Sequence, residues 1–158
     1  MLEQLQLDKQ LCFRLYSASR LITQQYHPLL AEHGLTYPQY LVLMVLWEKD
    51  GQPVNDIAKR LYLETNTVTP LLKRMEAEGI LRRQKAKADG GAKREDRAGR
   101  QDGRQVIVNL TEKGKALEKA VADIPFRVGS AVSCRSITPE SVPGLFETLD
   151  ELICTLAK

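Results

Sequence analysis

Between positions 55 and 110 the spacing of hydrophobic residues changes from a helical to an alternating pattern. Four apolar residues follow one another at steps typical of one buried helix face: Val68, Leu71, Leu72 and Met75. After Gly79 the period becomes two, in residues 80–85 and again in 105–110, which predicts a two-stranded ribbon. Gly79 itself is expected to end the helix.

A shorter helical pattern precedes this stripe. Asn55 is suited to cap it, and residues 62–64 leave room only for a turn before the next helix. Helix, turn, helix and ribbon in this order predict a winged helix-turn-helix over residues 36–111, with the second helix as the one that enters the DNA major groove. Pro70 would cost about 3 kcal/mol deep inside a helix, so that helix should begin near Asn66 or Thr67.

The polar face of the predicted second helix carries side chains that suit base edges and phosphates. Its candidate DNA contacts are Thr65, Thr67, Thr69, Lys73 and Arg74, and Arg82 and Arg83 follow on the first strand of the ribbon. The net charge of the chain is only +3, but residues 82–104 hold nine cations and four acids. A charged loop alone is as often merely solvated; beside a helix-turn-helix it favours contact with phosphates.

Amphipathic helices flank this region. One is expected over residues 5–31, another over 40–48 after the Thr36-x-x-Gln39 capping box, and the last begins at Thr138 or Ser141 and runs to about Leu156. Thr111 should open the helix that follows the ribbon, and Pro125 and Pro143 should kink or break the C-terminal pattern. The fold class is therefore mainly α with a small β wing, in one domain (1–158) whose terminal helices, 5–31 and 112–158, form a dimer interface.

Composition narrows the function further. The chain has 158 residues, 43% of them hydrophobic, with no apolar run near the ~20 residues that a membrane span needs. Three scattered cysteines and two histidines make a zinc site or a secreted disulfide framework improbable. We expect a cytoplasmic protein without metal or cofactor.

Cys12 shares a helix face with Tyr16, four residues on. A cysteine among apolar neighbours is more often an inert core residue, with its pKa raised by desolvation. It becomes nucleophilic only if hydrogen-bond donors such as phenols stabilise the thiolate. The spacing leaves both readings open.

Several consecutive motifs resemble the MarR family of bacterial regulators, over residues 9–115. Cys-Phe-x-Leu-Tyr from Cys12 and Thr-Tyr-Pro-Gln-Tyr from Thr36 are similar to the OhrR branch, whose members sense organic hydroperoxides through a thiol. The other matching stretches are residues 61–63, 69–76 and 102–111.

The resemblance implies a role for each sensor residue. Cys12 would be the peroxide-reactive cysteine, and Tyr26 and Tyr37 would hydrogen-bond its sulfur, Tyr37 from the other subunit. Cys134 would be the resolving cysteine of the opposite subunit, unless a small cellular thiol caps Cys12 instead. Cys154 is expected to be a packed core residue.

In the wing, Asp102 and Arg104 match the family's Asp-x-Arg, in which the arginine enters the minor groove. Residues 90–102 depart from the family by an insertion of roughly thirteen residues at the hairpin tip. Its cations would lengthen the DNA footprint or only raise non-specific affinity.

The interpretation is a homodimeric repressor that binds a pseudo-palindromic operator with Cys12 reduced and releases it when a peroxide oxidises Cys12. One alternative keeps the fold but has a phenolic or other aromatic ligand as the trigger. A thiol peroxidase is a weaker alternative, because the chain lacks a Thr-x-x-Cys motif; we therefore expect no enzyme activity.

Overall fold

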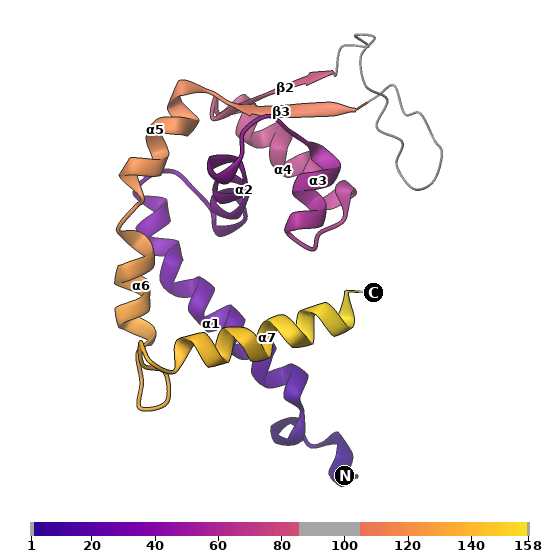
Figure 1. Ribbon diagram of the computed structural model, residues 1–158, viewed down its shortest axis with the longest axis vertical. Helices are drawn as coiled ribbons and strands as arrows, with labels where there is room; N and C mark the ends of the chain where they lie inside the picture. The colour runs from indigo at the N-terminus through magenta and orange to yellow at the C-terminus, as the bar shows by residue number, and fades with distance from the viewer. Residues whose placement is uncertain (1, 86–104, 158) are drawn as a thin grey trace. The chain divides into compact units, whose positions relative to one another are not determined.

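A computed structural model describes residues 2–85 and 105–157 (Figure 1). The chain forms two compact units, which we call the central unit (His27–Ala122) and the terminal unit (Met1–Tyr26 with Asp123–Lys158). Asp102, Arg104 and the expected insertion at 90–102 lie outside the described residues, so the expectations for them stay predictions.

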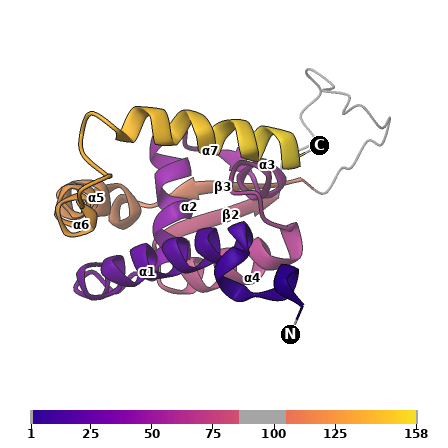
Figure 2. The same cartoon turned by 90° about the horizontal axis from the view of Figure 1, so that it is seen from below.

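The central unit holds a helix-turn-helix and a three-stranded sheet. Its helices are the last turn of α1 (Leu11–Ala31), then α2 (Tyr37–Glu48), α3 (Val54–Arg60), α4 (Thr65–Ala77) and α5 (Glu112–Ala120). The strands are β1 (Gln52–Pro53), β2 (Leu81–Lys85) and β3 (Val106–Leu110). In Figures 1 and 2, α2, α3 and α4 lie on one face of β2 and β3.

The sheet is antiparallel in the order β1-β3-β2, with Leu81 opposite Leu110 and Arg83 opposite Val108. The two-stranded ribbon expected from the period-two pattern is confirmed. The pattern missed β1, because two residues are too few to show a period and one of them is proline. Pro53 is tolerated there since β1 is an edge strand.

The terminal unit is helical. It begins with two 3-10 turns (Glu3–Leu5 and Leu7–Lys9), continues with α1 (Leu11–Ala31) and ends with α6 (Ile124–Val132) and α7 (Val142–Leu156). The expected helix start near residue 5 is wrong, because Gln6 and Gln10 are extended and interrupt the helical backbone. Pro125 and Pro143 stand in the first turns of α6 and α7, so the expected breaks come just before them.

Two helix starts differ from expectation. Asn55 is not a cap: Pro53 occupies that position, and the Asn55 amide oxygen instead accepts from the Thr65 hydroxyl at 3.3 Å. α4 begins at Thr65, one residue before the range that Pro70 suggested. The Asn66 carbonyl, which would have bonded the missing Pro70 N–H, lies on an exposed face where water can reach it.

The other helix ends follow the sequence. The Gln39 side-chain oxygen accepts from the Thr36 N–H at 2.8 Å, and the Thr111 hydroxyl accepts from the Gly114 N–H at 3.2 Å. Gly79, with φ of 71°, terminates α4 as expected. The C-terminal turn of α4 is also held by the Lys113 ammonium group, which donates to the Glu78 carbonyl at 2.9 Å.

Burial is very unequal between the units. Among the described residues, all buried hydrophobic side chains except Ile124 and Val128 belong to the central unit. Leu43, Leu46, Ile57, Leu72 and Met75 are the centre of its core, each with no exposed surface. The central unit therefore has its own core, whereas α7 buries no residue at all.

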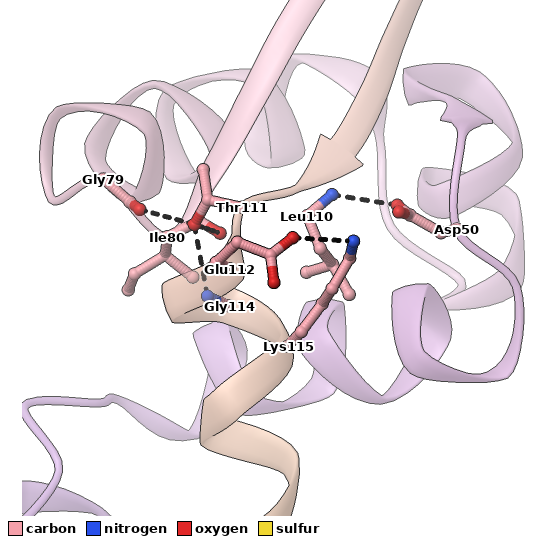
Figure 3. A network of polar contacts seen from close by, with 8 residues as sticks. All are labelled: Asp50, Gly79, Ile80, Leu110, Thr111, Glu112, Gly114 and Lys115. Atoms are coloured by element: carbon pink, nitrogen blue, oxygen red, sulfur yellow. Dashed lines mark hydrogen bonds and ion pairs between the residues drawn. The ribbon is translucent and has the colours of Figure 1, made fainter.

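A tight joint connects the wing to α5 (Figure 3). The Thr111 hydroxyl lies 2.7 Å from the Gly79 carbonyl oxygen and 2.9 Å from that of Ile80, and the Leu110 N–H donates to the Asp50 carboxylate at 2.9 Å. The Trp47 indole N–H donates to the Gly114 carbonyl at 3.0 Å. Strand β3, the end of α4 and the start of α5 are thus fixed to one another.

Gly114 is required in this joint because a side chain there has no room. An added Cβ would overlap the Ile80 carbonyl oxygen, a backbone atom held by the Thr111 N–H and hydroxyl. We predict that Gly114→Ala lowers the free energy of unfolding by about 2–4 kcal/mol, as severe steric overlap in a packed site does. Gly144→Ala is the control, since its Cβ meets nothing within 4 Å. Urea denaturation measures both; equal stabilities would contradict the assigned role of Gly114.

Candidate functional site

Helix α4 presents one buried and one exposed face. The apolar stripe Val68, Leu71, Leu72 and Met75 is buried, as predicted, and Thr65, Thr67, Lys73 and Arg74 are exposed. Thr69 is half-buried. The same helix face that the sequence selected for DNA is therefore free of the protein core.

All three candidate hydroxyls are already engaged inside the protein. The Thr65 hydroxyl donates to the Asn55 amide oxygen, and the Thr69 hydroxyl donates to the Thr65 carbonyl at 2.7 Å. The Thr67 hydroxyl donates to the Asn66 amide oxygen at 3.3 Å. Their oxygens can still accept hydrogen bonds. The Thr65 contact joins the first turn of α4 to the first turn of α3, which fixes the geometry of the helix-turn-helix.

Sequence reasoning missed Asn66. It is exposed and lies on one ridge with Pro70 and Lys73, at helix steps of four and three, opposite the buried stripe. An exposed Asn at the N-terminal end of a recognition helix can bond the adenine edge in the major groove. The helical step from Lys73 back to position 66 would have found it.

Arg83 differs from the other candidate DNA contacts because it is paired inside the protein. Its Nε and Nη2 atoms donate to Glu76 Oε2 at 2.9 and 2.7 Å, and its backbone N–H donates to Glu76 Oε1 at 2.9 Å. Glu76 lies on α4 and Arg83 on β2, so the pair ties the base of the wing to the recognition helix. Arg82, by contrast, is exposed.

The same pair controls the ionisation of Glu76. Hydrogen bonds from the Arg83 side chain and backbone, more than its charge, lower the pKa of the Glu76 carboxyl below its ordinary value. The pair is partly exposed, with 21% of the Arg83 side chain and 35% of the Glu76 side chain accessible. Solvent screening therefore limits what it adds to stability.

The sensor residues are spread over the terminal unit and the start of the central unit. Cys12 is exposed in the first turn of α1, and Tyr16, on the same helix, accepts from Arg20 Nη1 at 3.2 Å. Tyr26 is half-buried on α1, and burial raises the pKa of its phenol. Tyr37 begins α2 in the central unit.

The length of α1 separates Cys12 from Tyr26 of the same chain. Both residues belong to one helix, fourteen positions apart, which corresponds to about 21 Å at 1.5 Å per residue. Within one protomer the Tyr26 hydroxyl therefore cannot bond the Cys12 sulfur while α1 is intact.

The other two cysteines are also exposed. Cys134 lies in the turn between α6 and α7, where its N–H and carbonyl exchange hydrogen bonds with Ile137 at 3.2 and 3.1 Å. Cys154 is exposed on α7, so the expectation of a packed core residue is wrong for the single chain. The reason is that α7 has no buried face in one protomer.

In the described part of the chain, no helix is long and apolar enough to cross a membrane. Among residues 2–85 and 105–157, no three His, Cys, Asp or Glu side chains are grouped so that they could hold a metal ion.

Comparison with known proteins identifies the class of this fold. The sequence profile of the MarR family matches residues 35–90. Over 154 residues the chain is 37% identical to the organic hydroperoxide resistance transcriptional regulator of Bacillus subtilis, covering 98% of this chain and 94% of that protein. The protein is thus a winged-helix, DNA-binding transcriptional regulator, and it belongs to the MarR family.

Two further relatives agree. The regulator TtmR of Methylorubrum extorquens is 46% identical over 123 residues, or 78% of this chain, and the chain spans only 56% of TtmR. The solved structure of reduced AbfR bound to DNA superposes with a TM-score of 0.73 at 35% identity, covering 99% of this chain and 98% of that one. A crystal structure of AbfR of Staphylococcus epidermidis is also similar. AbfR has also been solved with a disulfide formed, at a TM-score of 0.61.

We predict that the Glu76–Arg83 pair stabilises the fold at neutral pH and not in acid. Because the folded-state pKa of Glu76 is lowered, its contribution is present above the ordinary glutamate pKa of about 4.3 and is lost as pH falls through the lower folded value. Glu76→Gln should cost up to about 1 kcal/mol at pH 7 and progressively less in acid. Denaturation across pH measures this, with the exposed Glu118→Gln as control. A cost that stays constant down to low pH would exclude the charge pair as its cause.

Proposed function

We propose that this protein is a homodimeric, redox-sensing repressor that releases its operator when a peroxide oxidises Cys12. The observation that supports it most is the exposure of Cys12 in the first turn of α1, in a chain similar to a hydroperoxide resistance regulator along nearly its whole length. The cytoplasm, where thiols are kept reduced, is the compartment in which such a switch works.

Exposed apolar side chains in the terminal unit support the dimer. The large ones are Leu2, Leu5, Leu7, Leu11, Leu15, Tyr16, Leu21, Ile22, Phe126, Leu145, Phe146, Ile153 and Leu156. So many in one small unit exceed what a stable monomer exposes to water. A second copy is the proposed partner, because reading a two-fold operator needs two recognition helices about 34–36 Å apart.

The dimer would also bring tyrosine hydroxyls to the Cys12 sulfur. Since Tyr26 of the same chain is too far along α1, the partner subunit's Tyr26 and the partner subunit's Tyr37 are the proposed donors to Cys12. This changes the expectation that Tyr26 acts within its own chain. Burial already holds the Tyr26 phenol protonated, with its pKa raised, which suits a donor.

The proposed chemistry is a two-step oxidation. The Cys12 thiolate attacks the terminal oxygen of a hydroperoxide, giving a sulfenic acid and an alkoxide that leaves as the alcohol after taking up a proton. A thiol, proposed to be that of Cys134 in the opposite subunit, then attacks the sulfenic sulfur, forming a disulfide and releasing water. Cys134 suits this step because it is exposed in a turn between two helices.

The effect of Cys12 oxidation would reach the DNA-binding surface at the two points where the chain passes from one unit to the other. The terminal and central units join within α1, between Tyr26 and His27, and between α5 and α6, at Ala122 and Asp123. A shift of α1 or α6 is therefore transmitted to α5, which the Thr111–Gly114 joint fixes to α4 and the wing. Oxidation would in this way change the separation of the two recognition helices.

The dimer proposal predicts that a charge on α7 separates the subunits. Phe146, 60% exposed in the single chain, should be buried in the dimer, where each side chain contributes about 1.5–3 kcal/mol. Phe146→Asp should raise the dimer dissociation constant at least about tenfold, measured by sedimentation velocity. Its exposed neighbour Glu147→Gln is the matched control. A dimer of unchanged strength in Phe146→Asp would place the interface elsewhere.

The redox proposal predicts that Cys12→Ser binds DNA normally but no longer responds to peroxide. A duplex selected from random sequence by the reduced wild-type protein serves as the probe. With cumene hydroperoxide, the wild type should lose affinity by about 5- to 150-fold, the range of ordinary allosteric coupling. Cys12→Ser should lose none, and Cys154→Ser, the control, should behave as the wild type.

Each result separates the alternatives. Peroxide-induced release by Cys12→Ser would end the redox proposal while leaving the DNA-binding regulator intact. Release of this variant by a phenolic compound, with no peroxide, would select the ligand-triggered alternative. A disulfide-linked dimer on non-reducing electrophoresis that disappears in Cys134→Ser distinguishes the two-cysteine route from capping by a small thiol.

A further inference from the structure

In the part of the chain that the structure describes, three helices end in the same hydrogen-bonded turn, but only two of these turns use glycine. After α1, Gly34 donates to Ala31 and Leu35 to Leu30; after α4, Gly79 donates to Glu76 and Ile80 to Met75. Both glycines have left-handed φ, of 68° and 71°. This turn is the Schellman motif, which needs a left-handed residue and is therefore usually closed by glycine.

The third copy, at the end of α3, places Tyr62 in the glycine position. The Tyr62 N–H donates to the Lys59 carbonyl at 3.2 Å and the Leu63 N–H to the Ala58 carbonyl at 2.9 Å, with Tyr62 at a φ of 54°. It is the only non-glycine residue with positive φ among those the structure describes. Backbone strain of this kind points to a function when it is retained where a better residue exists.

The Tyr62 side chain gains no compensating burial. It is 68% exposed, and Leu63 beside it is 39% exposed, whereas the residues that follow the two glycine turns, Leu35 and Ile80, are buried. Within residues 2–85 and 105–157, the Tyr62 hydroxyl makes no hydrogen bond. Packing therefore does not account for a tyrosine at this position.

Its location does suggest a role. Tyr62 belongs to the turn that leads into α4, three residues before the exposed Thr65 and four before Asn66. Residues that directly precede the N-terminal end of a recognition helix lie at the rim of the major groove, where the phosphates are. The exposed Lys59, one turn earlier on α3, adds positive charge to the same rim.

We propose that Tyr62 is a DNA backbone contact, whose phenol O–H donates to a phosphate oxygen at the edge of the groove read by α4. Tyrosine is one of the neutral side chains that position proteins on the duplex through phosphates. With 68% of its surface exposed, the Tyr62 side chain is accessible to a phosphate. The inference rests on DNA binding through α4, and it names a contact outside that helix.

The test uses two substitutions that should weaken DNA binding without weakening the fold. Tyr62→Gly restores the residue that the other two turns use, so thermal stability should be unchanged or higher. Its affinity for the selected duplex should nevertheless fall by about tenfold or more, the loss expected for a hydrogen bond to a charged group. Tyr62→Phe keeps the ring and should lose affinity with no change in stability.

Two further readouts identify the phosphate. Because the tyrosine is neutral, the slope of log affinity against log salt should stay that of the wild type in Tyr62→Phe, whereas loss of a lysine contact lowers it. A neutral methylphosphonate placed at the contacted position should weaken the wild type and leave Tyr62→Phe unaffected.

Wild-type affinity in both variants overturns the assignment of Tyr62 without touching the regulator. A loss of affinity in Tyr62→Gly that comes with lower thermal stability overturns it as well, since the tyrosine would then be structural. Failure of the wild type itself to select or bind any duplex would instead count against the proposed function.

Discussion

Burial of the apolar stripe on α4 is the constraint on which the DNA-binding surface depends. Val68, Leu71, Leu72 and Met75 fix the rotation of the helix about its axis, because turning it would expose them to water. The opposite ridge, with Asn66 and Lys73, is thereby aimed outward. Glu76 then extends this control to the wing by holding Arg83 of β2, so one helix orients both parts of the reader.

The two ends of α4 are held by different contacts. Its C-terminal end is held from two sides, by Lys113 of α5 and by the Gln39 amide of α2, which donates to the Glu78 carboxylate at 2.9 Å. The N-terminal turn is held by the buried Val68 and by the exposed contact of Thr65 with Asn55.

The two units divide stability and association between them. The central unit buries a core of its own, so its geometry does not need a second chain. The terminal unit leaves leucines of α1 and α7 exposed. In the proposed dimer these side chains would be buried by the second copy, without a change in the core of the central unit.

Periodicity and local chemistry determined much of this protein from the sequence alone. The stripe on α4, the ribbon after Gly79, the caps at Thr36 and Thr111 and the breaks before Pro125 and Pro143 depend on neighbours only a few residues away, which the chain order states directly. The resemblance to the MarR family followed from motifs of the same local kind.

Tertiary structure decided what depends on contacts between different helices and strands. In the sequence Arg83 is one cation of a basic segment, and only the fold shows that its guanidinium group is paired with the Glu76 carboxylate. β1 forms because it pairs with the edge of β3, and a strand of two residues is too short to be predicted from the sequence. The distance from Cys12 to Tyr26 follows from α1 being one unbroken helix, and the left-handed Tyr62 follows from the turn that the helix-turn-helix requires. In each case the deciding interaction joins residues of different helices or strands, or depends on a backbone conformation, and the spacing of side chains along the sequence shows neither.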